Sequence, residues 1–481
     1  MVKSKTLLKT YRLPKMPVKW MKRLNKAISL ILCGVLLIGF GSCSYEPEPT
    51  TEAVNLTFST DTLQFDTLFA ERLSITKRLK IKNPTNKAVN ISSIVLRNQS
   101  QAFQLTLNGR TQSSFSNQLL LPEDSLLLLV SANIDQGDEN NPFVIRDYLE
   151  VVNQENSQSV VFEAWGQNAH YLSDTILDCD ARWNAEKPYV LSGTVQVDSS
   201  CVLSIEPGTR IYSATQTFLV VNGSLQAEGT LENPIIFTND RLDEPFVSAA
   251  GQWGGIVFLE DSKDNYFKHT TIKNALFGVN LNIFNPDNEP DLMMENCFVG
   301  NMAISSVISL NSDFAAINSV FYNTASGTVS HTGGGSAYYT HCTIANYFNV
   351  AREDPSAFFS DLAFDNNDNE ILAPLEVQLL NSIIYGRITD EIQFFEQQEG
   401  NLNFSFSHNL FRSSISVLSE NNSISNQDPE FVEVNEADFR LQENSPAIDD
   451  ALPTNISTDI QGTSRGTSPD IGAYEYVEIE E

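Results

Sequence analysis

The stretch "THCTIAN" at residues 340–346 is one of six short segments that share a single pattern. The second residue is His or Asn, the third is small or carries an amide, and the fifth is apolar. The segments are "KHTTIKN" (268–274), "ENCFVGN" (295–301), "INSVFYN" (317–323), "THCTIAN" (340–346), "LNSIIYG" (380–386) and "SHNLFRS" (407–413). Their second positions lie 27, 22, 23, 40 and 27 residues apart. A recurrent spacing of 22–27 residues is the period of a β-solenoid, in which each coil covers the next.

His341 and Cys342 within this stretch could be a nucleophile with its base, or half of a metal site. Their positions in the repeat argue against both, because the other copies place Asn or His at the first position and Thr, Cys, Ser or Asn at the second. We therefore predict that His341 is a ladder residue along the solenoid and that Cys342 points inward. The sequence has no CxxC or HxxxH spacing, so it predicts no zinc site.

Both ends of the repeat region carry longer signatures. "VLSIEPGTRIYSATQTFLVVNGSLQAEGTLENPIIFTND" (202–240) with "QWGGIVF" (252–258) resembles the first rungs of bacterial right-handed parallel β-helix proteins of the pectate-lyase-like superfamily. "NSPAIDDALPTNISTDIQGTSRGTSPDIGAYEY" (444–476) resembles their closing segment. The resemblance implies a right-handed parallel β-helix, to which we assign residues 169–481. We expect its end to be closed by a structural cap built on Asp459, Arg465, Asp470 and Glu475, because an exposed rung needs a cover.

Residues 54–168 alternate apolar and polar residues between turn signals such as Asn83-Pro84-Thr85-Asn86. About seven strands in such a length predict a β-sandwich. The order of the segments resembles the cysteine-free immunoglobulin-like domains of the abnormal-spindle/hydin type. That resemblance implies a domain without catalytic residues, which would lift the β-helix away from a membrane.

The N-terminus predicts export. A basic segment is followed by "AISLILCGVLLIGF" (27–40) and then by "GSC" (41–43), which is the order of a secretory signal. "FGSC" resembles a bacterial lipobox, so residues 1–42 are expected to be a lipoprotein signal peptide and Cys43 the lipidated residue. The polar segment 43–53 would then be a tether. The protein is accordingly expected to be anchored by lipid to the outer membrane and to face the cell exterior.

The chain has 30 basic and 60 acidic residues. Nine of the basic residues precede residue 43, so the remainder carries 21 − 60 = −39. Such a surface is expected to repel nucleic acid, anionic lipid and polyanionic substrates. The expected binding partners are therefore neutral glycans or other molecules of the cell surface.

A non-catalytic module for adhesion, glycan contact or a structural role is the main functional prediction, and no catalytic residue is assigned. The alternative is a polysaccharide hydrolase or lyase that uses carboxylates in a loop-walled groove. The sequence lacks the NTD, GHG and RIK elements of polygalacturonase-like hydrolases, and its one candidate for their DD element, "IDD" (448–450), lies in the closing segment.

Calcium is the one cofactor that the sequence leaves open. Asp365, Asp368 and Glu370 cluster oxygen ligands without EF-hand spacing, and a solvated loop is the favoured interpretation. Four cysteines outside the signal, Cys179, Cys201, Cys297 and Cys342, allow three disulfide pairings.

Overall fold

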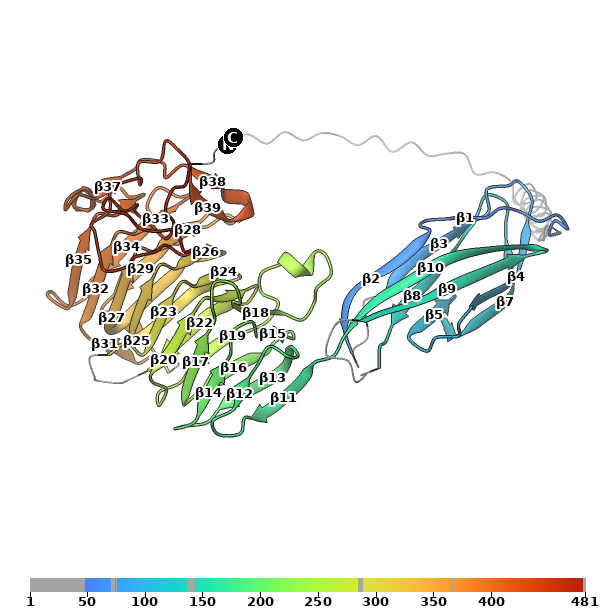
Figure 1. Ribbon diagram of the computed structural model, residues 1–481, viewed down its shortest axis with the longest axis horizontal. Helices are drawn as coiled ribbons and strands as arrows, with labels where there is room; N and C mark the ends of the chain where they lie inside the picture. The colour runs from blue at the N-terminus through green and yellow to red at the C-terminus, as the bar shows by residue number, and fades with distance from the viewer. Residues whose placement is uncertain are drawn as a thin grey trace, which may run out of the picture.

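The computed structural model describes residues 48–70, 74, 76–135, 143–283, 289–365 and 367–478. The predicted signal peptide 1–42 and Cys43 lie outside these residues. Within the described ranges, no helix is long and apolar enough to cross a membrane. The chain forms an N-terminal β-sandwich and a large parallel β-helix (Figure 1), so the predicted all-β fold class is confirmed.

The sandwich consists of two five-stranded sheets packed face to face. One sheet contains, in spatial order, β1 (Thr57–Phe58), β3 (Lys77–Lys82), β8 (Ser125–Ala132), β5 (Phe103–Leu107) and β6 (Arg110–Gln112). The other contains β2 (Thr62–Phe69), β10 (Asn156–Gln167), β9 (Phe143–Asn153), β4 (Val89–Leu96) and β7 (Ser114–Leu120). All neighbours are antiparallel except β2 and β10. Alternate residues of each strand point into a shared apolar core, which is the alternation seen in the sequence.

Part of the segment expected to be a tether packs on the sandwich. The backbone N–H of Thr50 donates to the carbonyl oxygen of Ala88 over 2.8 Å. The N–H of Val54 donates to Oδ1 of Asn153, also over 2.8 Å. Residues 50–54 are therefore held to the sandwich, close to the turn between β3 and β4.

The β-helix is one 25-stranded sheet that winds around the interior. Its strands form three faces, and neighbouring strands within each face are parallel. Face A contains β16 (Phe218–Val221), β19 (Gly255–Phe258), β22 (Phe277–Asn282), β29 (Ala357–Ser360) and β34 (Ile392–Phe395). Face B contains β12 (Arg182–Trp183), β14 (Val202–Ile205), β17 (Ser224–Glu228), β20 (Asn265–Lys268), β23 (Leu292–Glu295), β32 (Leu375–Leu380) and β35 (Leu402–Ser407). Face C contains β15 (Arg210–Ser213), β18 (Ile235–Asn239), β21 (Thr270–Lys273), β24 (Phe298–Met302), β26 (Val320–Thr324), β28 (Thr343–Asn346), β33 (Ile383–Gly386), β36 (Leu410–Phe411) and β37 (Ile424–Ser425).

Four longer strands bend from one face to another. β11 (His170–Ile176) and β13 (Tyr189–Val197) run from face C to face A, whereas β25 (Ser305–Ile317) and β27 (Val329–Thr340) run from face A to face B. The remaining elements are β30 (Leu362–Phe364), β31 (Glu370–Leu372), β38 (Phe431–Glu433), β39 (Asp438–Leu441) and the 3₁₀ turns η1 (Phe246–Ser248), η2 (Ser416–Ser419) and η3 (Val434–Glu436). A disulfide joins Cys179 to Cys201, while Cys297 and Cys342 are free and buried. One bond thus forms among these four cysteines, and none of the three full pairings that the sequence allowed is present.

The C-terminal segment packs along the side of the β-helix. We call residues 431–476 the strap. Its apolar side chains, such as Phe439 and Ile471, cover an unusually apolar outer surface of face C that includes Val320, Ile383 and Leu410. The ring of Phe439 lies 5.9 Å from that of Tyr322, and Figure 1 accordingly shows β38 and β39 beside β26 and β28. Both faces of the sheet are therefore buried here, one by the interior and one by the strap.

Candidate functional site

His341 lies at a backbone corner between faces B and C. Its φ is 51°, and the second residue of the other five segments also has a positive φ, between 41° and 54°. Asn and His tolerate this left-handed conformation better than most residues, which explains the pattern in the sequence. Nε2 of His341 lies 2.9 Å from Nδ2 of Asn381 on the next rung. The ladder role predicted for His341 thus has a backbone cause as well as a side-chain one.

Neither residue of the His341–Cys342 pair is prepared for catalysis. Both side chains are buried. Burial lowers the pKa of His341 to about 3, with the charge of Arg465 contributing in the same direction. Burial also raises the pKa of the Cys342 thiol to about 12, so the thiolate that a nucleophile needs is absent at neutral pH. Cys342 points inward, and its backbone N–H donates to Oγ of Ser382 on the next rung over 3.1 Å.

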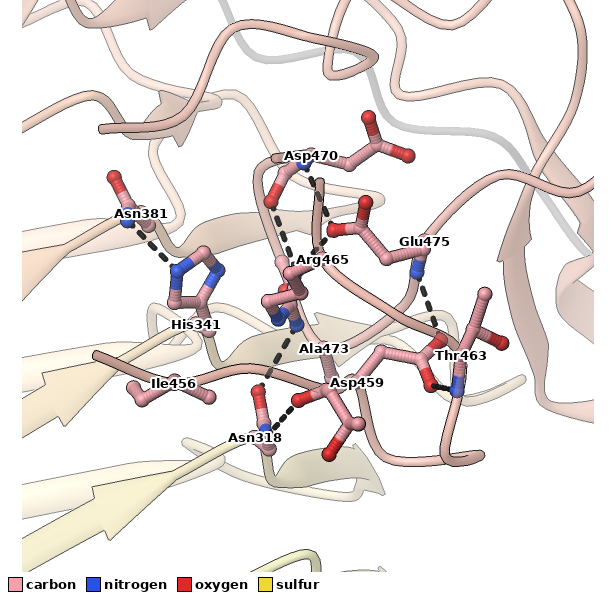
Figure 2. Close-up of polar contacts among 12 residues, drawn as sticks. Asn318, His341, Asn381, Ile456, Asp459, Thr463, Arg465, Asp470, Ala473 and Glu475 are labelled. Atoms are coloured by element: carbon pink, nitrogen blue, oxygen red, sulfur yellow. Dashed lines mark hydrogen bonds and ion pairs between the residues drawn. The ribbon is translucent and has the colours of Figure 1, made fainter. Parts of the chain in front are cut away.

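The four residues expected to form the cap do come together (Figure 2). Arg465 pairs with Oε1 of Glu475, and it also donates to the carbonyl oxygens of Asp470 and Gly472. The carboxylate of Asp459 accepts from the backbone N–H groups of Thr463 (2.7 Å) and Glu475 (2.9 Å). The strap is therefore folded around one buried cation and three buried or half-buried carboxylates.

This network lies beside the β-helix, on the corner row that contains His341. Nη2 of Arg465 donates to Oδ1 of Asn318 over 3.0 Å, and Nδ2 of Asn318 donates to the carbonyl oxygen of Thr458 over 2.7 Å. Asn318 and His341 are the corner residues before β26 and β28, which are several rungs short of the last strand, β37. The network thus fastens the strap to the side of the β-helix, and a role in closing the last rung stays a prediction.

Glu475 provides a pH-dependent prediction. Burial raises its pKa from the ordinary 4.5 to about 7. A carboxyl with a raised pKa binds its proton more tightly in the folded than in the unfolded chain, so its contribution to stability is lost as pH rises and regained as pH falls from 7 toward 4.5. We expect the melting temperature of the wild type, relative to that of Glu475→Gln, to rise as the pH is lowered from about 8 to about 5. A relative fall over this range would show instead that Arg465 stabilises the ionised carboxylate.

Of the calcium candidates, Asp365 has its carboxylate engaged in a local turn. The carboxylate of Asp365 accepts from the side-chain amide of Asn369 and from the backbone N–H groups of Asn369 and Asn367, each over 2.8 Å, and these bonds lower its pKa. In the described part of the chain, no three His, Cys, Asp or Glu side chains are grouped so as to hold a metal ion. Asp365, Asp368 and Glu370 precede or begin β31, in a hairpin that packs on β27.

The outer surface of face A has a groove that the sequence did not predict. Consecutive rungs align Ile308, Ser330, Phe358 and Gln393 in one outward row. Turn residues border this row, and together they enclose about 370 Å³. The lining consists of Ile304, Ser305, Ile308, Ser326, Gly327, Ser330, Asp354, Pro355, Phe358 and Gln393. Asp354 is the one charged residue among them. Only the register between strands, which a sequence does not give, reveals that these residues are neighbours.

The wall of this groove is fixed from below by a buried ion pair. Arg352 donates to both carboxylate oxygens of Glu391 over 2.7 Å, and the two side chains are 5% and 0% exposed. The same carboxylate accepts from the N–H and the hydroxyl of Ser356. Residues 352–356, which include Asp354, are thereby held against the next rung.

A second set of polar and aromatic side chains lies on face B. Ser336 lies between Asp313 and Glu376 of the neighbouring strands, and Tyr338 is the next residue of its strand on the same face. The pKa of Tyr338 is raised by burial, by a hydrogen bond to Glu376 and by the charges of Glu376 and Asp313. Asp313 and Glu376 are two strand spacings apart, or about 9.5 Å. The outer surface of face B thus brings two carboxylates beside an aromatic ring, which is the arrangement that the enzymatic alternative requires.

One stretch of the chain is similar to a known protein family. Residues 174–280 match the model of the pectate-lyase like β-helix domain, and these residues form a β-helix of that type. No curated protein sequence matches the chain.

Several solved structures share features with the chain at low similarity. They include a family 123 glycoside hydrolase from Clostridium perfringens (9% identity, TM-score 0.17, 24% of this chain and 30% of that one). A second is the ASH / PapD-like domain 7 of human CEP192 (14% identity, TM-score 0.17, 26% of this chain and 95% of that one). A third is the catalytic domain of a GH87 α-1,3-glucanase in complex with tetrasaccharides (11% identity, TM-score 0.17, 73% of this chain and 80% of that one). The chain thus spans under a third of the family 123 enzyme. At such TM-scores, none of these likenesses assigns an activity.

Proposed function

We propose that this chain, with its pectate-lyase-like β-helix domain, is a lipid-anchored surface protein that binds neutral glycans along the face A groove without cleaving them. The observation that carries the proposal is the outward row Ile308, Ser330, Phe358 and Gln393, which is uncharged on four successive rungs. A sugar presents C–H groups that pack on apolar and aromatic side chains, and hydroxyl groups that bond to hydroxyl, amide and carboxylate groups. The groove offers each of these partners.

Charge and location also support the proposal. Asp354 is the single charged group in the groove, so a neutral ligand suits it better than a polyanion. The Cys179–Cys201 disulfide suits an exported protein, since disulfides persist in oxidising compartments. The signal-like residues 27–43 supply the route of export and the anchor.

Phe358 is expected to contribute most of the apolar contact with the sugar. We expect Phe358→Ala, in a protein comprising residues 44–481, to weaken binding to a neutral polysaccharide at least tenfold, because truncation of a central aromatic contact commonly costs over about 1.4 kcal/mol. Retardation in polysaccharide-containing native gels, with a panel of neutral and acidic polymers, measures this. Phe364→Ala is the matched control, since Phe364 is 59% exposed on the hairpin and does not line the groove.

Two outcomes would contradict the proposal. If Phe364→Ala weakened binding as much as Phe358→Ala, the groove would not be the site. If new reducing ends or unsaturated products appeared, the protein would be an enzyme. In that case Asp313→Asn and Glu376→Gln would test the carboxylates of face B.

A further inference from the structure

One sheet of the sandwich has a charge opposite to that of the rest of the chain. The strands β1, β3, β8, β5 and β6 contain five basic residues and no acidic one. The basic residues are Lys77, Arg78, Lys80, Lys82 and Arg110. The opposite sheet contains Arg146 and four acidic residues, and the whole chain has twice as many acidic as basic residues. The repulsion of anionic surfaces expected from the net charge therefore does not apply to this sheet.

The cations of β3 form a row on the outer face of the sheet. Arg78, Lys80 and Lys82 alternate with the buried Leu79 and Ile81, and all three are exposed. Side chains two residues apart in a strand lie on the same face, about 6.6 Å apart. Within the described ranges none of the three makes an ion pair, unlike Lys77, which lies 3.8 Å from Asp66.

Leucines lie directly beside this row. Lys80 is opposite Leu127 on β8, and Arg78 is opposite Leu129. Leu127 is 49% exposed. A row of cations without ion pairs, next to the exposed Leu127 and the half-buried Leu129, suits a surface that offers both anionic groups and an apolar layer.

The chain also enters the sandwich at one end of the row. Thr57 of β1 pairs with Lys82, and Thr50 and Glu52 contact Ala88 and Lys87 in the turn that follows β3. Cys43 is seven residues before Thr50, the first residue held to the sandwich, so the length of the connecting chain limits the anchor to about 25 Å from the sandwich. Acidic Glu123 and Asp124 occupy the turn at the same end, which makes Arg78 and Lys80 the better test positions.

We propose that the outer face of this sheet docks on an anionic lipid surface. The charge row and the leucines carry the proposal, and acylation of Cys43, which belongs to the proposed function, is not needed for it. Docking would hold the sheet parallel to the bilayer, so that the lipid anchor and the sheet face together orient the β-helix. Each contact is weak, and several together give measurable binding.

The test uses residues 44–481, which lack the acylated cysteine, with vesicles of phosphatidylcholine alone or with about 30 mol% phosphatidylglycerol. We expect co-sedimentation with the anionic vesicles only, and its loss at about 0.5 M salt. Arg78→Glu with Lys80→Glu should reduce the partition coefficient at least tenfold. Arg182→Glu with Lys263→Glu makes the same charge change at exposed positions of the β-helix and should have little effect.

Three results would overturn the proposal. One is equal binding to neutral and anionic vesicles, and another is an equal loss in the two double variants. The third is an absence of vesicle binding together with a dimer, seen by light scattering, that Arg78→Glu with Lys80→Glu dissociates, because the partner would then be an acidic protein surface. Thermal melting of each variant confirms that it is folded. Glycan binding by the same preparations shows whether the proposed function fails independently.

Discussion

Replacing Arg465 with alanine is expected to destabilise the strap by about 3–5 kcal/mol, the cost of breaking a buried ion pair from one side. Arg465 is 7% exposed. Its guanidinium is the cation of the buried network, and the acidic members are Asp459, Asp470 and Glu475. Its removal leaves like charges together away from water, and it also takes donors from Asn318 and Gly472. Urea unfolding followed by fluorescence measures the loss, and limited proteolysis shows whether residues 431–476 come away first.

Arg440→Ala is the matched control for this prediction. Arg440 belongs to the same strap and pairs with Asp438, but the two side chains are 49% and 26% exposed. An exposed pair contributes about 0–1 kcal/mol. If the two substitutions had equal effects, or if Arg465→Ala left the melting temperature unchanged, Arg465 would not be what fastens the strap to the β-helix.

Replacing Glu391 with alanine should have an effect of similar size, about 3–5 kcal/mol, in the middle of the β-helix. The substitution leaves Arg352 buried without its partner. It also removes the acceptor for Ser356 and for the N–H of Ile388. The packing is close enough that a Cβ on Gly386 would lie 2.2 Å from Oε1 of Glu391, which accounts for Gly at the position where four of the other five segments have Asn. Urea unfolding again measures the loss.

The second readout for Glu391→Ala is glycan binding. Since Glu391 holds residues 352–356, release of this segment should also move Asp354 and weaken binding in the groove. Glu353→Ala is the control, because Glu353 is exposed in the same segment. If Glu391→Ala destabilised the protein and left binding unchanged, the segment would be structural and Asp354 would not contact the ligand.

Much of the β-helix could be predicted from local features. The corner between faces B and C requires a left-handed residue, and Asn or His supplies it at positions such as Asn318 and His341. The apolar fifth residue of each segment, such as Ile344, points into the interior. These requirements act within one coil and recur in every coil, so they appear in the sequence as a period. The alternating sandwich strands are visible for the same reason.

The groove, the Arg352–Glu391 pair and the lateral position of the strap could not be predicted in this way. Arg352 lies in a segment that reads as a loop between repeats, yet it is buried against a carboxylate 39 residues later. The position of Arg465 in the closing segment predicts a cap on the last rung. Its partner Asn318, however, is 147 residues away and several rungs from that end. Such pairings depend on the register of one rung over another and on the path of the chain after the last rung.

The sequence by itself therefore determined the architecture: a sandwich and a stacked parallel coil, with residues such as His341 at its left-handed corners. Tertiary structure alone decided where binding surfaces can form. The row Ile308, Ser330, Phe358 and Gln393 on face A exists only because successive rungs align. The cations on the outer face of β3 have no acidic residue on a neighbouring strand, because pairing brings together five strands that contain none. Local chemistry fixes the shape of each coil, whereas a surface is made of residues that stacking and pairing bring together.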